Sequence, residues 1–225
     1  MIVAARDEAD RIVDTLRALE VAFPGARVIV ADDGSRDDTA SLAEEAGAEP
    51  ASRADRGRGK GAAMTAAALP LLALAGSTDA PTIVLCDGDL GASAARLRPL
   101  AEAIEANDCD LAVAAFARSE GGGFGLALGF ARRAIRNLTG LELRAPISGQ
   151  RALRADLLPA LVPFAPGFGI EIGMTVDAAR AGARVMEIEL ELEHRATGRT
   201  LRGFLHRGRQ LRDFVTVYVA RRKSN

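Results

Sequence analysis

Two aspartates, Asp87 and Asp89, are separated by a single glycine directly after the apolar run of residues 82–86. Carboxylates this close repel each other, and one tends to keep its proton unless a cation or hydrogen-bond donors compensate the charge. A divalent cation that carries a diphosphate would neutralise the pair, and hard oxygen ligands of this kind suit Mg²⁺ or Mn²⁺. An Asp-Gly-Asp turn without a ligand is the alternative interpretation, and only the neighbouring motifs argue against it.

A basic, glycine-rich segment at residues 53–64 could supply a matching phosphate site. It contains Arg53, Arg56, Arg58 and Lys60, set among glycines directly before a predicted helix. Glycines let backbone amides approach an anion, the amino end of a helix attracts it, and Lys60 adds a full positive charge. The spacing of a Walker motif is missing, so a solvated basic loop is the alternative.

Two further aspartate pairs follow another apolar run, in the segment ADDGSRDDT. Asp37 and Asp38 stand at the predicted start of a helix, where carboxylates cap the first amides and pair with the helix dipole. Asp32 and Asp33 come before the turn, where a carboxylate can accept hydrogen bonds from a base or a ribose. We therefore interpret only Asp32 and Asp33 as candidate ligand contacts.

One of the two histidines, His194, stands at the end of a predicted strand, before a loop that contains arginine and glycine. An imidazole beside Asp89 would complete a metal site and shift the preference toward Mn²⁺. A structural histidine with satisfied hydrogen bonds is the alternative.

The elements that must hold these residues follow an alternating pattern. Apolar runs cover residues 2–5, 26–31, 82–86 and 109–116, and the amphipathic stretches between and after them begin near Asp7, Ser35, Ser93 and Leu126. This alternation predicts an α/β fold, in which a mostly parallel sheet is flanked by helices. Ligands of such sheets bind at the carboxyl ends of the strands, where both acidic segments lie.

The pattern changes after Thr139. Residues 148–154 predict a strand, residues 169–182 a helix that Gly182 ends, and residues 183–194 a strand of strict alternation. Four glutamates on the polar side of that strand are interpreted as a solvated face. We expect a single domain over residues 1–225, in which residues 117–225 elaborate a ligand-binding half at residues 1–116.

Composition limits the class of protein. The 225 residues are 48% apolar and 26% charged, with a net charge of −1, which is typical of a soluble globular protein and indicates no overall affinity for nucleic acid. The longest apolar stretch, 66–75, is about half of a bilayer span, and the first residues lack the order of a secretion signal, so a cytoplasmic protein is expected. Cys86 and Cys109 are interpreted as small buried side chains.

Six segments, taken in order, resemble the family-two nucleotide-sugar glycosyltransferases of the GT-A fold: ARDEADRI, VIVADDGSRDDT, GRGKGAA, VLCDGDL, ISGQRALR and EHRATGR. The resemblance covers nearly the whole chain. It implies a metal-dependent transferase that moves a hexose from a UDP- or GDP-linked sugar to an acceptor. It also implies that Asp33 recognises the nucleobase, Asp87 the ribose or sugar, Asp89 the metal, and Lys60 the nucleotide or phosphate. The residues implied to line the donor pocket are Ala4, Ala5, Arg6, Asp7, Gly88 and Gly149.

The segment PFAPGFGIEIGMTVDAARAG, followed by LEHR, resembles the retaining glucosyl-3-phosphoglycerate synthases. This likeness implies that Glu171 lies at the sugar and acceptor site and that His194 is a metal ligand together with Asp89. Glu171 is the candidate base if the acceptor is a hydroxyl and configuration inverts. If the acceptor is a phosphate, or if the configuration of the sugar is retained, no base is required and Glu171 only holds the sugar. The stretch after residue 120 also resembles that group's acceptor loop, but Gly125-Leu126 replaces its threonine-bearing part.

The expected partners are a nucleotide sugar and a small-molecule or lipid-phosphate acceptor, and a second copy of the chain is a further candidate. Residues 200–223 predict a basic amphipathic helix, whose apolar stripe comprises Leu201, Phe204, Leu205, Leu211, Val215, Tyr218 and Val219. Either this stripe packs on its own domain, or the helix lies on an anionic membrane surface, which would suit a polyprenyl-phosphate acceptor.

Two other classes of protein remain as alternatives. A nucleotidyltransferase would share the acidic sheet edge and the metal, but its Gly-rich opening loop is absent after the first strand. A member of the family that binds nucleotide without turnover is the other alternative. The presence of Lys60, Asp87, Asp89 and His194 argues against such a loss of activity.

Overall fold

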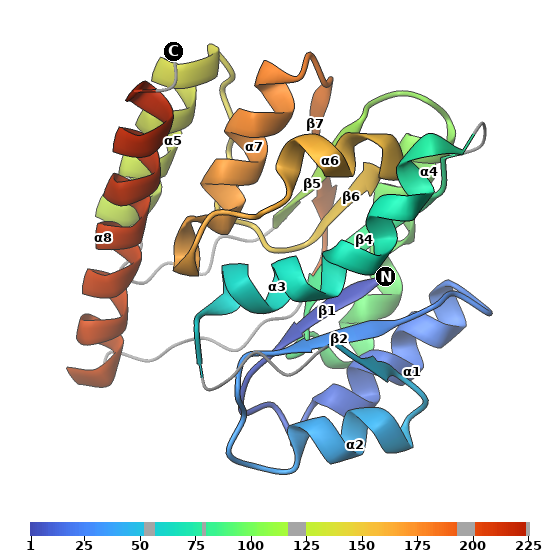
Figure 1. Ribbon diagram of the computed structural model, residues 1–225. Coiled ribbons are helices and arrows are strands. Elements are labelled where there is room, and N and C mark those ends of the chain that lie inside the picture. The colour runs from blue at the N-terminus through green and yellow to red at the C-terminus, as the bar shows by residue number, and fades with distance from the viewer. Residues whose placement is uncertain (52–56, 78–79, 117–124, 193–200, 224–225) are drawn as a thin grey trace.

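A twisted sheet with helices on both faces forms the centre of the computed structural model, which describes residues 1–51, 57–77, 80–116, 125–192 and 201–223 (Figure 1). In this part of the chain the sheet has seven strands in the order β3-β2-β1-β4-β6-β5-β7. The strands are β1 (Ile2–Ala5), β2 (Ile29–Asp32), β3 (Glu49–Pro50), β4 (Thr82–Asp87), β5 (Leu111–Phe116), β6 (Arg151–Arg154) and β7 (Val185–Leu190). Only β6 runs antiparallel to its neighbours, β4 and β5. The predicted α/β fold with a mostly parallel sheet is confirmed.

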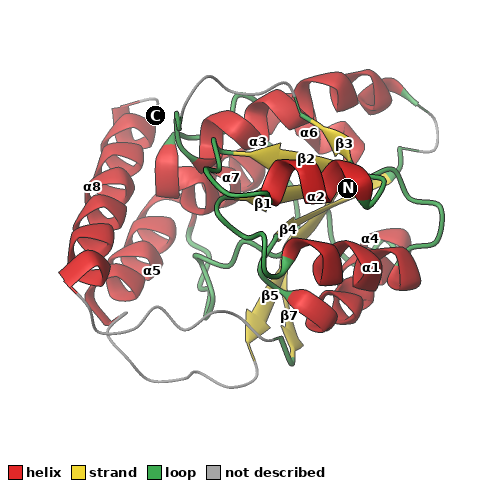
Figure 2. Ribbon diagram, turned by 90° about the horizontal axis from the view of Figure 1, so that it is seen from below, coloured by secondary structure: helices red, strands yellow, loops and turns green. Residues whose placement is uncertain are grey.

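Of the described helices, all but the last lie between successive strands of the chain. The α-helices are α1 (Ile12–Ala22), α2 (Thr39–Glu45), α3 (Lys60–Ala68), α4 (Arg98–Glu105), α5 (Gly125–Thr139), α6 (Leu158–Leu161), α7 (Ile170–Arg180) and α8 (Leu201–Lys223). Short 3₁₀ helices are η1 (Leu69–Gly76), η2 (Gly91–Leu97), η3 (Ala155–Leu157) and η4 (Gly167–Gly169). Figure 2 shows α1 and α4 on one side of the sheet and α3, α6 and α7 on the other.

Both faces of the sheet are buried, which explains why its strands are continuous apolar runs rather than alternating ones. Val3 and Val84 pack on one face with side chains from α1 and α4, including Leu16. Ile2 and Leu85 point to the opposite face and pack with α3, α6 and α7. A third cluster joins α5, α7 and α8. Cys86 and Cys109 are buried and free, as predicted.

Two predicted helices begin later than the sequence pattern indicates. The first starts at Ile12 rather than near Asp7, because Asp7 has a left-handed backbone (φ +55°) and its amide bonds Ser35 Oγ at 2.9 Å. The stretch after Ser93 is a 3₁₀ helix up to Leu97, and the α-helix follows from Arg98. Pro99 stands in the first turn of that helix, where its missing N–H leaves no bond unmade.

The polar side of β7 is only partly solvated, which corrects the interpretation of its glutamates. Only 10% of the Glu187 side chain is exposed, and its carboxylate accepts hydrogen bonds from the backbone amides of Arg144 (2.8 Å) and Ala145 (2.6 Å). Glu187 therefore anchors the loop before β6 to β7. Glu189 is exposed, in agreement with the prediction, and Glu193 lies outside the described residues.

The buried face of α8 differs from the predicted apolar stripe. Phe214 and Val217 are each 1% exposed, whereas Leu211, Val215 and Val219 are 37%, 41% and 43% exposed. The reason is that hydrogen bonds and ion pairs of α8, described below, fix which side of the helix faces the molecule. The side chains of residues 201–209 lie outside the described part. Among the described helices, none combines the length and apolarity needed to cross a membrane.

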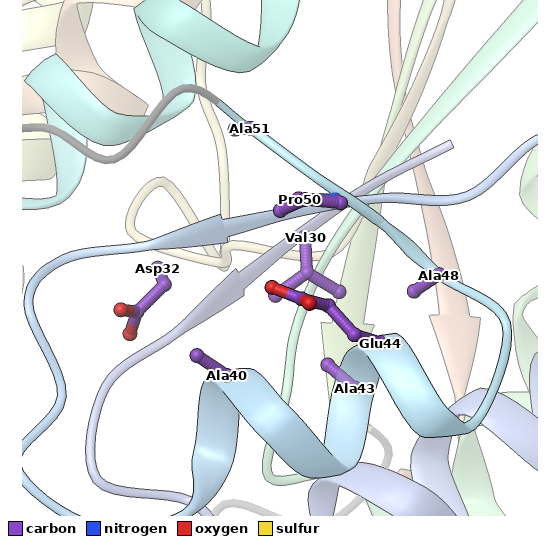
Figure 3. Close-up of a pocket in the computed structure, with 8 residues that line it drawn as sticks. All are labelled: Val30, Asp32, Ala40, Ala43, Glu44, Ala48, Pro50 and Ala51. Carbon is purple, nitrogen blue, oxygen red and sulfur yellow. The ribbon is translucent and has the colours of Figure 1, made fainter.

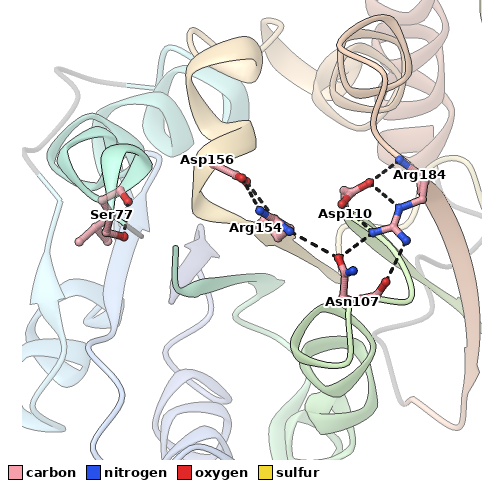
Figure 4. A network of polar contacts seen from close by, with 7 residues as sticks. Ser77, Asn107, Asp110, Arg154, Asp156 and Arg184 are labelled. Carbon is pink, nitrogen blue, oxygen red and sulfur yellow. Dashed lines mark hydrogen bonds and ion pairs between the residues drawn. The ribbon is translucent and has the colours of Figure 1, made fainter. Parts of the chain in front are cut away.

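A polar network ties the amino ends of β5 and β7 to the carboxyl end of the antiparallel strand β6, away from the edge that carries the acidic segments (Figure 4). The Arg184 guanidinium donates to both carboxylate oxygens of Asp110, each at 3.0 Å, and to the Asn107 backbone oxygen at 2.8 Å. Arg154 joins the network through the Asn107 side chain and Asp156. The hydrogen bonds from Arg184 lower the pKa of Asp110. The network therefore stabilises the far end of the sheet.

Asp110→Asn is expected to lower the melting temperature by about 2–4 °C at neutral pH, since it removes one charge of a bidentate pair. A carboxyl whose pKa is lower in the folded state stabilises the fold above its unfolded pKa, near 4, and loses this contribution as the pH falls through the folded value. The difference in melting temperature between this variant and wild type should therefore vanish toward pH 3, as measured by thermal melts. Asp108→Asn, at an exposed neighbouring position, is the control; a difference that persists in acid would contradict the assignment.

Candidate active site

The two acidic segments meet at the carboxyl ends of three adjacent parallel strands. Register pairs Ala4 of β1 with Asp87 of β4, and Ala5 with Asp32 of β2. The backbone continues these contacts past the strand ends, because the Gly88 amide donates to the Ala4 oxygen at 2.8 Å. The predicted residues from β1, β2 and β4 therefore lie along one edge of the sheet.

The Lys60 ammonium forms the centre of the site. Its Nζ lies 2.7 Å from Asp87 Oδ1 and 2.8 Å from Glu171 Oε1, and only 22% of the lysine side chain is exposed. Lys60 is the first residue of α3, Asp87 the last of β4, and Glu171 lies in the first turn of α7. The second Asp87 oxygen, Oδ2, accepts a hydrogen bond from Gln150 Nε2 at 2.8 Å. The structure thus brings together three residues that the sequence singles out, and adds Gln150.

Burial alone would lower the pKa of Lys60, because it disfavours the charged form. The charges of Asp87 and Glu171 and their hydrogen bonds outweigh this, so the pKa of Lys60 is raised above its ordinary value. A cation with a raised pKa stabilises the fold fully below its unfolded pKa, near 10.4, and loses this contribution only as the pH rises through the folded value. Lys60 is therefore a permanent positive charge at working pH, suited to bind an anion and unsuited to act as a base.

The compensation of the Asp87 charge differs from the expectation. From the sequence we expect a divalent cation to neutralise both Asp87 and Asp89, whereas the structure pairs Asp87 with Lys60 and Gln150. The reason is that Lys60, distant in sequence, enters from the start of α3 directly onto this edge. Asp89 remains as the carboxylate whose chemistry suits a hard cation.

The Asp-Gly-Asp turn supplies oxygen ligands of the kind that a divalent metal ion takes. The Asp89 carboxylate and the phosphate oxygens of a bound diphosphate are oxygen ligands that fit Mg²⁺ or Mn²⁺. His194, the second predicted ligand, lies outside the described residues, as do Arg53 and Arg56. Among the described residues, no group of three His, Cys, Asp or Glu side chains could hold a metal by itself. The residues present fit a metal that arrives with its diphosphate.

Asp33 and Arg6 form a second polar group at the β1 and β2 ends. Arg6 Nη1 donates to Asp33 Oδ2 at 3.0 Å, and the backbone amide of Gly59 donates to Asp33 Oδ1 at 2.8 Å. Gly57 lies beside the Arg6 guanidinium with a left-handed backbone (φ +63°). Asp33 therefore connects the front of the chain to the glycine-rich loop directly before Lys60.

The other predicted acidic residues shape the turns around this edge. Asp32 accepts a hydrogen bond from the Ser35 amide at 3.1 Å and one from its hydroxyl, so it closes a turn and is not placed as a ligand contact. Asp37 accepts from the amides of Thr39 and Ala9, each at 3.1 Å. The hydrogen bond from the Thr39 hydroxyl is the largest of several that lower the pKa of Asp37. The capping interpretation is confirmed for Asp37, whereas the Asp38 side chain makes no cap bond.

Gly149 lies directly against the charged centre. A Cβ at this position would lie 2.6 Å from Asp87 Oδ2 and 2.8 Å from Lys60 Nζ, distances at which something must move. The loop of Gly149 is in turn held by Arg151, whose buried guanidinium donates to the oxygens of Ser148 (2.9 Å) and Pro146 (3.1 Å). Burial lowers the pKa of Arg151 to about 10, against the opposing charges of Glu171 and Glu187.

Sequence reasoning missed the roles of Gln150 and Arg151. Both follow Ser148-Gly149 in a short segment that resembles the family motif, which was the available signal. Nothing in local patterning shows that β6 inserts antiparallel between β4 and β5, and this placement brings Gln150 to Asp87.

A mostly apolar depression lies elsewhere, between α2 and the strands β2 and β3 (Figure 3). Asp32 and Glu44 are the charged residues in its lining. Lys60 and its partners Asp87, Gln150 and Glu171 do not line it. Because Asp32 is already engaged in its turn, this depression offers no set of convergent polar groups of the kind that ligand sites contain.

Comparison with known proteins gives consistent results. The family model described as glycosyl transferase family 2 matches residues 1–161. Among curated proteins, none matches the chain. Solved structures of glucosyl-3-phosphoglycerate synthase from Mycobacterium tuberculosis are similar: the complex with phosphoglyceric acid has a TM-score of 0.75 and 25% identity, over 98% of this chain and 78% of that one.

Two further complexes of the same enzyme show the same likeness. The complex with Mn²⁺, uridine-diphosphate-glucose and phosphoglyceric acid has a TM-score of 0.73 and 26% identity, over 98% of this chain and 78% of that one. The complex with Mg²⁺ and uridine diphosphate has a TM-score of 0.74 and 26% identity, over 98% and 77%. Since the family match covers most of the chain and the fold agrees with it, the protein belongs to glycosyl transferase family 2 and is a glycosyltransferase of the GT-A fold.

Proposed function

We propose that the protein transfers a hexose, in the first instance glucose, from a uridine-diphosphate-linked donor in the presence of Mn²⁺ or Mg²⁺. The observation that carries the proposal is the Lys60 ammonium held between Asp87 and Glu171 at the carboxyl edge of β4. A fixed positive charge beside two hydrogen-bond acceptors suits a ligand that combines a diphosphate with sugar hydroxyls. The similar synthase, solved with Mn²⁺ and uridine-diphosphate-glucose, supports this choice of donor.

In this proposal Asp89 and His194 hold the metal, which when bound stabilises the negative charge of the departing diphosphate. Lys60 lies at the amino end of α3, where the helix dipole and the preceding glycines also favour an anion. When the diphosphate binds, Lys60 exchanges part of its contact with the carboxylates for phosphate oxygens. Asp87 and Glu171 then accept hydrogen bonds from hydroxyls of the ribose or hexose.

Asp33 serves the other end of the donor. Only 9% of its side chain is exposed, and it is fixed by Arg6 and the Gly59 amide. A carboxylate held in this way is positioned to accept an N–H of the uracil ring. Because the same carboxylate anchors Gly59, recognition of the base is connected through one residue to the position of Lys60.

For Glu171 the geometry favours sugar binding over proton abstraction. The carboxylate that would accept the acceptor's proton already bonds Lys60 at 2.8 Å, so the two roles compete. This supports a transfer with retention of configuration, in which no base is required. The anomeric proton coupling of the product, followed by NMR from the first minutes, distinguishes the outcomes: an α-linked glucoside is expected, and a β-linked product would assign Glu171 as the base.

A donor panel tests the proposal directly. Uridine-diphosphate-glucose with Mn²⁺ is expected to raise the melting temperature by about 5 °C at a concentration near a hundred times its dissociation constant. Guanosine-diphosphate-mannose should give a smaller shift, and excess EDTA should remove most of the increase in melting temperature. If no sugar nucleotide raises the melting temperature with either metal, the proposed function is wrong. Tight metal-dependent binding without any slow donor hydrolysis would instead favour a non-catalytic member.

Two acceptor classes are worth separate assays. The complexes of the similar synthase favour a small phosphorylated acid such as phosphoglyceric acid. The exposed Leu211, Val215 and Val219 of α8 favour a lipid-phosphate acceptor reached by peripheral membrane contact. Flotation with anionic liposomes tests the lipid-phosphate acceptor, because the absence of a lipid-bound fraction would exclude the membrane contact that it needs.

Gly149→Ala is expected to lower the rate of donor turnover by about ten- to a hundredfold, because the added methyl must separate Lys60 from Asp87. Stability should change little, since the atoms that must move are the ends of side chains. The measurement is the initial rate of uridine diphosphate release. Gly129→Ala in α5, where an added Cβ has nothing within 4 Å, is the matched control. Unchanged turnover in Gly149→Ala would show that the Lys60–Asp87 contact is dispensable.

A further inference from the structure

The carboxyl-terminal helix α8 contacts the segment that leads into Glu171, although it lies outside the residues matched by the family model. Asp213 of α8 accepts a hydrogen bond from the Phe168 amide at 3.2 Å through Oδ2. Only 17% of the Asp213 side chain is exposed. Its carboxylate thus lies at η4, just before the amino end of α7, where the helix dipole favours a negative charge.

The fit between α8 and η4 is so close that it requires glycine at two positions. A Cβ on Gly167 would lie 2.2 Å from Asp213 Oδ2, and a Cβ on Gly169 would lie 2.2 Å from Val217 Cγ2. Gly167 also has a left-handed backbone (φ +59°), which other residues rarely adopt. The turn before Glu171 is therefore shaped against α8.

A second contact holds α8 along α7. Arg221 donates to Asp177 through Nη2 at 2.6 Å and Nε at 3.1 Å, and both side chains are about one-fifth exposed at 18% and 20%. Arg180 of α7 also donates to the Arg221 backbone oxygen at 2.8 Å. Since Asp213 and Arg221 lie about 12 Å apart along the helix, α8 is attached to α7 at two separate points.

The same segment touches the loop that carries Lys60. A Cβ on Gly59 would lie 3.3 Å from Gly167 Cα, and a Cβ on Gly61 only 2.0 Å from the Ala165 oxygen. The residues on both sides of Lys60 thus rest on residues 165–167, and Glu171 follows this segment directly. Any shift of residues 165–169 would move Glu171 and the support of Lys60 together.

We infer that α8 is a positioning element of the active site and that Asp213 is its main positioning residue: by fixing residues 167–169 it sets the position of Glu171 against Lys60. Asp213 acts through this backbone and touches no reacting group. The consequence for turnover rests on the proposed function, whereas the consequence for the Lys60–Glu171 contact does not.

The chain offers a direct readout, because Lys60 is one of only two lysines and Lys223 is the other. Lys223 is exposed, so its rate of acetylation by a water-soluble ester measures the reactivity of the reagent. The rate at Lys60, relative to that at Lys223, measures how accessible the site is. In Asp213→Ala we expect Lys60 to be acetylated roughly tenfold faster relative to Lys223, an effect within the range for residues coupled through a backbone shift. Peptide mass spectrometry measures both lysines in one sample, well below the melting temperature.

Two companion variants separate positioning from loss of fold. Asp213→Asn keeps an oxygen acceptor for the Phe168 amide and should restore most of the protection of Lys60. Arg222→Gln, at an exposed position of α8, should behave as wild type. Unchanged Lys60 protection in a folded Asp213→Ala would overturn the inference, and so would equal deprotection in Arg222→Gln.

Turnover of uridine-diphosphate-glucose with Mn²⁺ gives the second readout. Asp213→Ala should lower kcat about tenfold with little change in donor KM, and it should have no further effect in a Glu171→Gln background. Equal losses in both backgrounds would show a general structural role and contradict the inference. If the wild type does not turn over this donor, the proposed function fails, and the acetylation result still decides the role of Asp213.

Discussion

Lys60→Met should lower donor turnover by about a hundred- to thousandfold, the effect typical of removing one group that stabilises charge in the transition state. The substitution keeps the length and apolar stem of the side chain and removes its charge. Asp87 and Glu171, which bond the ammonium at 2.7 and 2.8 Å, then face each other without a cation. The leaving diphosphate also loses its fixed partner at the start of α3.

The same substitution should lower the free energy of unfolding by about 2 kcal/mol, less than for a fully buried pair because the groups are partly exposed. Urea titration measures this, and uridine diphosphate release measures the activity. Lys223→Met, at the only other lysine, is the matched control and should leave both quantities unchanged. A fully active Lys60→Met enzyme would remove Lys60 from the mechanism.

Asp89→Ala should abolish the metal-dependent part of nucleotide binding and weaken the binding of uridine diphosphate by about a hundredfold, as expected if Asp89 is a ligand of the metal. Isothermal titration with uridine diphosphate, in Mn²⁺ and in EDTA, measures the two parts separately. In EDTA, wild type and variant should bind alike, since Lys60 and Asp33 are intact.

The control for this experiment is Asp14→Ala, which removes an acid that is 69% exposed on α1. It should bind uridine diphosphate with the wild-type metal dependence. If Asp89→Ala retains the full effect of Mn²⁺, the metal is held by other residues and the role proposed for the Asp-Gly-Asp turn is wrong.

Much of the fold and one edge of the site could be predicted from local patterns. The apolar runs at residues 2–5 and 82–86 became β1 and β4, and parallel pairing then places the residues after them side by side. Asp33 and Asp87 lie at the same edge of the sheet for this reason, and Lys60 joins them from the start of α3. Their chemistry, one carboxylate at each strand end and a lysine after glycines, is visible in the sequence itself.

The contact between Lys60 and Glu171 could not be predicted in this way, because the two residues are 111 positions apart. Their distance depends on α7, whose amino end is shaped by tight glycine contacts with α8. The residues with which α8 packs on the domain could not be predicted for a related reason. Hydropathy selected the stripe with Leu211 and Val215, whereas the hydrogen bond of Asp213 and the ion pair of Arg221 turn Phe214 inward.

The most direct test of the account is a crystal structure of the protein with Mn²⁺ and uridine-diphosphate-glucose. We expect the diphosphate within hydrogen-bonding distance of Lys60 Nζ, the metal on Asp89, and hydroxyls of the donor on Asp87 or Glu171. A donor bound elsewhere, with Lys60 still held by both carboxylates as in the present structure, would contradict the central claim that this lysine is the anion-binding centre of the transferase.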